Sequence, residues 1–131
     1  MPDDEIPGRR LAVAAEALYL TNLLLAPGLA FVAIALLWRR HRQTASPLAR
    51  NHLRQAFLVS LWGGLLIVAV TTALLLFVDN GGALWTAVIL YFTCIHSTLV
   101  LFGIVGLARA MAGQNFRYPL IGPRLLENEH D

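Results

Sequence analysis

Three long apolar stretches dominate this 131-residue chain, and they constrain its fold more than any other feature. They run from Ala17 to Trp38, from Ala56 to Val78 and from Ala83 to Ala108. A helix of about 20 apolar residues, rising about 1.5 Å per residue, is long enough to cross ~30 Å of hydrocarbon. Hydrophobic residues make up 57% of the chain and charged residues only 14%, a composition that suits lipid better than water. The sequence therefore predicts an all-α membrane protein with three transmembrane helices.

The breaks between these stretches predict how the spans are joined. Pro27-Gly28 interrupts the first stretch, and we expect one kinked span there rather than two half-spans. Ser46-Pro47 is typical of a helix start, so the second helix should begin in the interface. Asp79-Asn80-Gly81-Gly82 predicts a tight antiparallel hairpin of the second and third spans, because glycine readily adopts the left-handed conformation that turns the chain.

The arginines predict the orientation of the spans. Residues 39–55 form an arginine-rich loop, and the segment 113–131 forms a basic tail after the 17–112 transmembrane domain, whereas segment 1–16 carries only Arg9 and Arg10. The positive-inside rule then predicts a protein of the bacterial inner membrane with segment 1–16 outside and the loop and C-terminus in the cytoplasm. Arg39, Arg40 and Arg42 either bind anionic lipid headgroups or only set this topology. A net charge of +2 argues against a nucleic-acid partner.

Polar residues within the third stretch form a stripe. Thr86, Thr93, His96 and Ser97 lie, with Gly103, within about a third of the helix circumference, and we expect this face to point at protein. An ionisable residue inside a membrane is a functional candidate, so His96 is a candidate for proton transfer, ligand binding or contact with a partner. The simpler interpretation is structural, with His96 bonding a carbonyl group that Pro27 cannot satisfy.

Catalytic and cofactor motifs are absent from the sequence. It contains no phosphate-binding glycine loop, no HExxH or GxSxG motif and no pair of intramembrane carboxylates, and Glu16 is expected at the outer interface. Cys94 is the single cysteine, which excludes an intrachain disulfide and a cysteine-based zinc site. Haem ligation by two histidines of one chain is disfavoured, because His52 should lie ~20 Å from the depth of His96. We therefore expect a protein that is not an enzyme and has no cofactor or metal.

Two segments near the cytoplasmic face resemble a known family. They are Pro47 to Phe57 (PLARNHLRQAF) and Gly113 to Leu120 (GQNFRYPL). In this order they resemble the Tic-twenty-like family of small bacterial membrane proteins, whose bacterial members mostly form a domain of unknown function, and they look similar to the magnetosome protein MamF. The family usually continues its first motif with Asn-Phe-Gln, where this chain has Leu58, Val59 and Ser60. The resemblance implies a helical membrane protein acting through partners, and it brings no catalytic residues.

These observations lead to three competing functions. The first is a non-catalytic accessory, assembly or scaffold subunit that binds other membrane proteins or copies of itself. Its platform for packing and partner docking would combine the two motifs: His52, Arg54, Gln55, Arg117, Tyr118 and Pro119. The second is an oligomeric pore or transporter lined by the polar stripe. The third is a redox subunit that holds haem between His96 residues of two chains.

Overall fold

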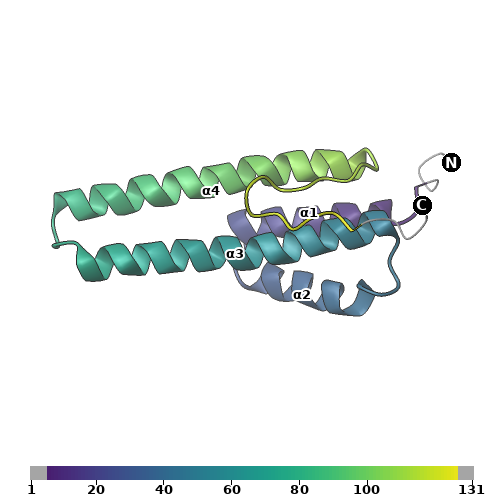
Figure 1. Cartoon of the computed structure of the whole chain (residues 1–131), viewed down its shortest axis with the longest axis horizontal. Helices are drawn as coiled ribbons and strands as arrows, with labels where there is room; N and C mark the ends of the chain where they lie inside the picture. The colour runs from purple at the N-terminus through teal and green to yellow at the C-terminus, as the bar shows by residue number, and fades with distance from the viewer. Residues whose placement is uncertain (1–5, 127–131) are drawn as a thin grey trace.

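The computed structural model describes residues 6–126, and within that range the chain folds into four α-helices without a strand. They are α1 (Arg9–Leu24), α2 (Leu29–His41), α3 (Pro47–Phe77) and α4 (Gly82–Met111). α3 and α4 form a long antiparallel hairpin, while α1 and α2 pack against one half of it, and the tail after α4 folds back over the same half (Figure 1). Residues 1–5 of the expected outer segment and 127–131 of the expected tail lie outside the described residues.

Among the described residues, two helices rather than three are long and apolar enough to cross a membrane. α3 has 31 residues and α4 has 30, and only 11% of the most apolar stretch of each is buried inside the protein. The core helix of a soluble protein would be mostly buried, so these exposed apolar surfaces suit a lipid environment. α1 and α2 have 16 and 13 residues, or about 24 and 20 Å, which is short of a ~30 Å hydrocarbon layer. The prediction of three spans is wrong.

The first apolar stretch is a helical hairpin, so the expected kinked span at 17–38 is also wrong. α1 ends at Leu24, and the Ala26 N–H bonds the Thr21 carbonyl at 2.9 Å instead of continuing the helix. The Asn22 side chain then accepts the Gly28 N–H at 3.0 Å. Gly28 has a φ of 85°, a conformation that is strained for residues with a Cβ. The chain therefore reverses direction here, and α2 runs back beside α1 (Figure 1).

The other two predicted boundaries are present, although one of them forms by a different mechanism. Ser46 caps α3, its hydroxyl accepting the Ala49 N–H at 3.4 Å, and Pro47 is the first helical residue. The α3–α4 hairpin turns at residues 78–81, one residue earlier than the expected 79–82, and Gly81 is extended, with a φ of −166°, rather than left-handed. The Trp85 indole donates a 3.2 Å hydrogen bond to the Asn80 side chain at this turn. No residue of this turn has a positive φ, so the chain reverses here without a left-handed glycine.

Both ends of the described chain lie at the same end of the molecule. The Ser46 hydroxyl, in the loop before α3, donates a 2.8 Å hydrogen bond to the Pro7 carbonyl. Gly113, directly after α4, packs against the side chain of Ile6. The start of α1 therefore lies beside the loop and the tail, as a consequence of the α1–α2 reversal. The expected topology separates these segments by the membrane, whereas residues 6–16 and the described part of the tail lie together; the side of the membrane on which each lies stays a prediction.

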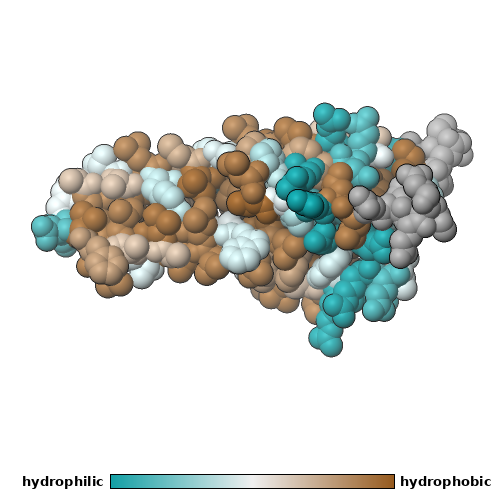
Figure 2. Space-filling model, viewed as in Figure 1, coloured by the Kyte–Doolittle hydropathy of each residue, from teal (hydrophilic) through white to brown (hydrophobic). Residues whose placement is uncertain are grey.

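Charge is distributed very unevenly along the molecule. The ten basic residues are all arginines, and they lie at the start of α1, the end of α2, the following loop, the start of α3, the end of α4 and the tail. These segments form the hydrophilic end of the space-filling view, whereas the surface that extends along α3 and α4 to their turn is predominantly hydrophobic (Figure 2). We call the first region the arginine end.

Candidate functional site

A closed group of polar side chains lies inside the arginine end. Glu16 of α1, His52 of α3 and Tyr118 of the tail are at most 1% exposed. Glu16 Oε1 lies 2.6 Å from His52 Nδ1, and the Tyr118 hydroxyl donates to Glu16 Oε2 at 2.5 Å. One carboxylate thus joins three segments that are far apart in the sequence. We call these three residues the Glu16 cluster.

The hydrogen bonds of His52 determine how many protons the cluster holds. His52 Nε2 lies 2.9 Å from the Gln114 carbonyl oxygen, which can only accept, so Nε2 carries a hydrogen. One further proton then lies between Nδ1 and Glu16, either on the imidazole or on the carboxyl group. In both arrangements the pair as a whole is neutral, which reduces the cost of burying it.

Tyr118 remains a hydrogen-bond donor under ordinary conditions. Burial of its ring, followed by the nearby Glu16 carboxylate, raises the pKa of Tyr118 far above its usual value. The phenol therefore keeps its proton and donates a hydrogen bond to Glu16. Its ring also meets the Tyr19 ring edge-on, with centroids 5.1 Å apart.

Small residues on the neighbouring helix create the space for this cluster. Gly106 of α4 faces the carboxylate so closely that a Cβ at this position would lie 2.7 Å from Glu16 Oε2. A Cβ on Gly103 would lie 2.7 Å from the Tyr19 ring. On α1, Ala12 and Ala15 are completely buried on the same face as Glu16. Close helix packing therefore holds the acid in position.

The tail is attached to α3 by a second set of hydrogen bonds. The Gln55 amide donates to the Pro123 carbonyl at 2.7 Å and accepts the Tyr118 N–H at 3.3 Å. Asn51 accepts the Leu126 N–H at 2.7 Å. Arg54 donates to the Arg124 carbonyl at 2.6 Å. Three polar residues from the first motif therefore bind the backbone of the segment that carries the second motif.

The structure brings some of the predicted site residues together and separates others. His52, Gln55 and Tyr118 are buried at the contact between α3 and the tail, and Arg54 reaches the tail beside them. Arg117 donates to the Gly122 carbonyl at 3.2 Å, within the tail itself. Pro119 is exposed on the adjoining turn. The proposed lipid-binding residues Arg39, Arg40 and Arg42 are exposed around the end of α2.

The polar stripe of α4 does not face protein as a unit, contrary to the prediction. Thr86, Thr93 and Ser97 are exposed, and only His96 is partly buried. Thr86 donates to the Gly82 carbonyl of its own helix at 2.8 Å, and such a bond allows a hydroxyl to face lipid. Of the predicted face, Gly103 does meet protein, since a Cβ there would lie 2.7 Å from the Tyr19 ring of α1. The buried residues of α4 are Leu84, Leu99, Gly103, Gly106 and Ala110.

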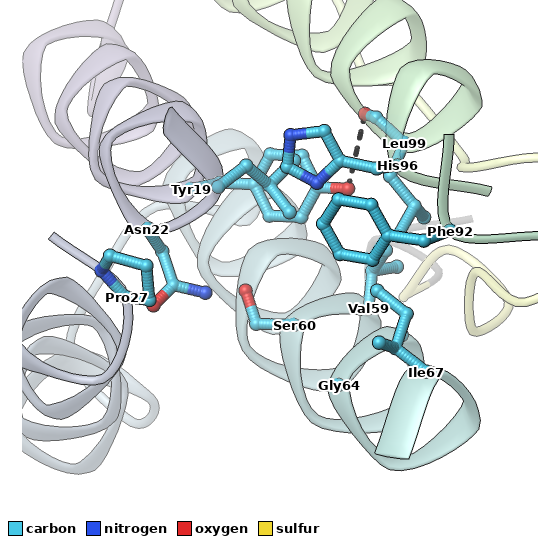
Figure 3. A pocket seen from close by; sticks show the side chains of 12 residues that line it. Tyr19, Asn22, Pro27, Val59, Ser60, Gly64, Ile67, Phe92, His96 and Leu99 are labelled. Atoms are coloured by element: carbon cyan, nitrogen blue, oxygen red, sulfur yellow. Dashed lines mark hydrogen bonds between the residues drawn. The ribbon is translucent and has the colours of Figure 1, made fainter. Parts of the chain in front are cut away.

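His96 lies beside a cleft at the tip of the α1–α2 hairpin. Its ring stacks on Phe92, with centroids 5.1 Å apart and an interplanar angle of 14°. The cleft has a volume of ≈ 210 Å³, and both Pro27 and Ser60 line it, as Figure 3 shows. Gly64 also lines it and faces open space, whereas the neighbouring Gly63 packs against the Leu99 side chain of α4.

Glu16 is the important residue that the sequence pattern did not single out. Placing the first span across the membrane puts Glu16 at the opposite interface from His52, whereas in the structure the two are in contact. One usable signal was present in the sequence. Ala12, Ala15, Glu16 and Tyr19 recur at helical spacing, so a lone acid shares a face with two small residues and an aromatic one.

Fold and site together define a class of protein: a small helical protein with two helices long and apolar enough to cross a membrane, a short α1–α2 hairpin packed against one half of them, and a tail held by buried polar residues. The chain belongs to the MamF/MmsF family, the magnetosome magnetite crystal formation protein family, whose sequence profile matches residues 8–126. No curated protein and no solved structure matches the chain. The similarity to magnetosome proteins is thus established at the level of the family, and it extends over all four helices and the tail.

Proposed function

We propose that this chain is a non-catalytic assembly or scaffold subunit of a membrane protein complex that takes part in magnetite crystal formation. The observation that carries this proposal is the closure of the Glu16 cluster. Its three side chains are at most 1% exposed and bonded to one another, which leaves no room for a substrate. A buried, saturated polar network of this kind stabilises one arrangement of segments. Here that arrangement is the tail folded onto α3.

The surface available to a partner is the outer side of this folded tail. Arg117, Leu120 and Arg124 are exposed there, beside the buried residues that hold the segment in place. A pre-ordered segment loses little conformational entropy when it binds, so it suits the docking of another subunit or a second copy. The anionic lipid surface is a further partner of the arginine end.

Membrane orientation follows from the same distribution of charge. All ten arginines lie near the end that holds both termini of the described chain, and the positive-inside rule assigns that end to the cytoplasm. The α3–α4 turn then faces the opposite compartment. In this proposal the host membrane is the bacterial inner membrane or a membrane derived from it.

Native purification tests the scaffold function. A tagged chain is extracted from membranes of the producing cell with a mild detergent, and the proteins that accompany it are identified and quantified. We expect Arg117→Ala/Arg124→Ala to reduce their recovery severalfold, while Asp79→Ala, at the opposite end, leaves it unchanged. Equal recovery from all three chains, or recovery of the tagged chain alone as a monomer, would contradict the proposal.

A pore is the second candidate, because one observation favours it. Thr86, Thr93 and Ser97 are exposed on α4 in the single chain, where an oligomer could gather them around a polar path. Liposomes containing the purified protein would then release a trapped ion or small solute. Tight liposomes at a protein density that gives several oligomers per vesicle would eliminate this candidate.

A further inference from the structure

The tip of the α1–α2 hairpin does not fill the space between α3 and α4. The cleft of ≈ 210 Å³ lies between Asn22 and Pro27 on one side and Phe92 and His96 on the other. A wider groove of ≈ 460 Å³ shares Asn22, Pro27, Ser60 and Gly64 with it and continues along α3. Ser60 lies six residues beyond Arg54, about 9 Å deeper along the helix than the arginine end. The cleft is therefore placed within the apolar part of the molecule.

Ser60 has an unsatisfied hydroxyl group at the centre of this cleft. Its side chain is 9% exposed, and its Oγ atom is buried without a hydrogen-bond partner among the described residues. Hydroxyls in apolar helices normally bond a carbonyl of the preceding turn, as Thr21 does with Ala17 at 2.8 Å and Thr98 with Cys94 at 2.7 Å. Burying an unpaired hydroxyl is unfavourable, so a ligand atom that bonds Ser60 would gain from it.

The walls of the cleft indicate what such a ligand looks like. The Asn22 side-chain oxygen already accepts the Gly28 N–H, so its NH₂ group is the part that can donate to a ligand. Figure 3 shows Ser60 and Asn22 directed into the same opening, with the Phe92 and His96 rings on the other side. The residues that line the cleft include no Asp, Glu, Lys or Arg. A charged headgroup would therefore have no counter-ion there, whereas a neutral one with acceptor oxygens would find two donors.

We propose that this cleft binds a neutral, lipid-soluble molecule whose head is a single ring carrying carbonyl or hydroxyl oxygens. The volume suits a ring, because an apolar cavity of about 150 Å³ is enough to hold benzene. The stacked pair of Phe92 and His96 supplies a flat wall. Exposed Leu61, Leu65 and Val68 line the outer groove, so an apolar chain attached to the ring can lie there in contact with lipid.

Binding is tested with the full chain in nanodiscs, using a benzoquinone with a decyl chain as the probe. Histidine labelled with ¹³C provides the readout, because His96 faces the cleft while His41 lies near the loop at the other end of α2. We expect a saturable shift of the His96 signal alone. Decylbenzene and decanol, which lack the oxygens or the ring, should require at least about threefold higher concentration for the same shift, which is the effect of losing one hydrogen bond.

Two variants distinguish the cleft from general partitioning into lipid. Gly64→Leu places a side chain in the open volume without a clash at its Cβ, and it should abolish the saturable shift. Gly82→Leu, at another open position far along the chain, should leave the shift unchanged. Ser60→Ala should weaken probe binding about threefold to tenfold without lowering the thermal stability of the protein.

Three results would overturn the proposal. The first is an equal response to the quinone and to decylbenzene, which would mean that the cleft does not recognise the oxygens of the ring. The second is unchanged binding in Gly64→Leu. The third is a Ser60→Ala protein that is less stable but binds the probe normally, which would mean that water already satisfies the hydroxyl.

Discussion

Replacement of Glu16 tests whether the Glu16 cluster holds the three segments together. Glu16→Ala leaves the His52 imidazole and the Tyr118 hydroxyl buried without their common partner. Breaking a buried ion pair by removing one member costs about 3–5 kcal/mol, so we expect a loss of free energy of unfolding in that range. Tyr118→Phe removes only one hydrogen bond to the carboxyl group and should cost about 1.5–3 kcal/mol.

Glu16→Gln separates charge from hydrogen bonding at the same position. A glutamine can donate its amide hydrogen to His52 Nδ1 while its carbonyl oxygen accepts the Tyr118 hydroxyl, so each bond has a replacement. The His52 Nε2–H bond to Gln114 is compatible with the neutral ring that this requires. Since desolvation offsets most of the attraction in a buried pair, we expect Glu16→Gln to stay within about 1 kcal/mol of the parent chain.

Unfolding by added SDS in mixed micelles, followed by tryptophan fluorescence, measures these differences, because the chain has three tryptophans. Asp79→Asn, in the exposed α3–α4 turn, serves as the charge-matched control and should not shift the transition. Hydrogen bonds in membrane proteins average only about 0.6 kcal/mol in double-mutant cycles. A Glu16→Ala cost no larger than that value would refute the assignment of the cluster as the clamp. Equal losses in Glu16→Gln and Glu16→Ala would instead refute hydrogen bonding as its main contribution.

Further predictions concern packing, backbone strain and topology. Gly106→Ala should destabilise the fold by about 1–3 kcal/mol, because its methyl group overpacks against Glu16. Gly64→Ala meets open space and should not destabilise it. Equal midpoints of SDS unfolding for the two variants would contradict this. Leu120 is fully exposed with a φ of 66°. Leu120→Gly should raise the free energy of unfolding by roughly 0.5 kcal/mol, because the backbone strain that it relieves exceeds the chain entropy that glycine adds to the unfolded state. A lower midpoint of SDS unfolding would contradict this. In a Cys94→Ala background, single cysteines that replace Ile6 and Thr44 should react with an impermeant maleimide from the same side of sealed vesicles. A cysteine that replaces Asn80 should react from the other side. Labelling of positions 6 and 44 from opposite sides would reject the α1–α2 hairpin.

Sequence alone predicts the two long helices and their ends well, because these features depend on local chemistry. Apolar runs of adequate length, a serine–proline start and a glycine-rich turn act through neighbouring residues only. The prediction of a span for the first apolar stretch is wrong, because its length and composition suit a span as well as a hairpin. The reversal depends on the side chain of Asn22, which accepts the Gly28 N–H. A kink and a full reversal at Pro27-Gly28 share the same sequence signal.

The wrong prediction for the first apolar stretch also affected the prediction of the candidate site. A spanning helix separates Glu16 from His52 by the thickness of the membrane, and the reversal brings them into contact. The motifs themselves pointed to the right region, because His52, Gln55 and Tyr118 all lie at the contact of the tail with α3. Their common partner could not be identified without the path of α1. The exposed hydroxyls of α4 could not be placed from the sequence either, because a hydroxyl that bonds within its own helix, as that of Thr86 does, need not face protein.

The α1–α2 hairpin has two ends with different physical roles. At the arginine end, α1 is joined to α3 and the tail by short hydrogen bonds to one buried carboxyl group, and glycines allow the contact to be close. At its tip, the same hairpin meets open volume and the unsatisfied hydroxyl of Ser60. Changes in the Glu16 cluster should therefore alter stability with little effect on the cleft, and changes at Gly64 should do the reverse. Glu16 and Gly64 share no hydrogen-bond partner. The effects of their substitutions on the free energy of unfolding should therefore add to within about 0.5 kcal/mol in the double variant. A larger coupling would mean that the hairpin moves as one rigid body between its two ends.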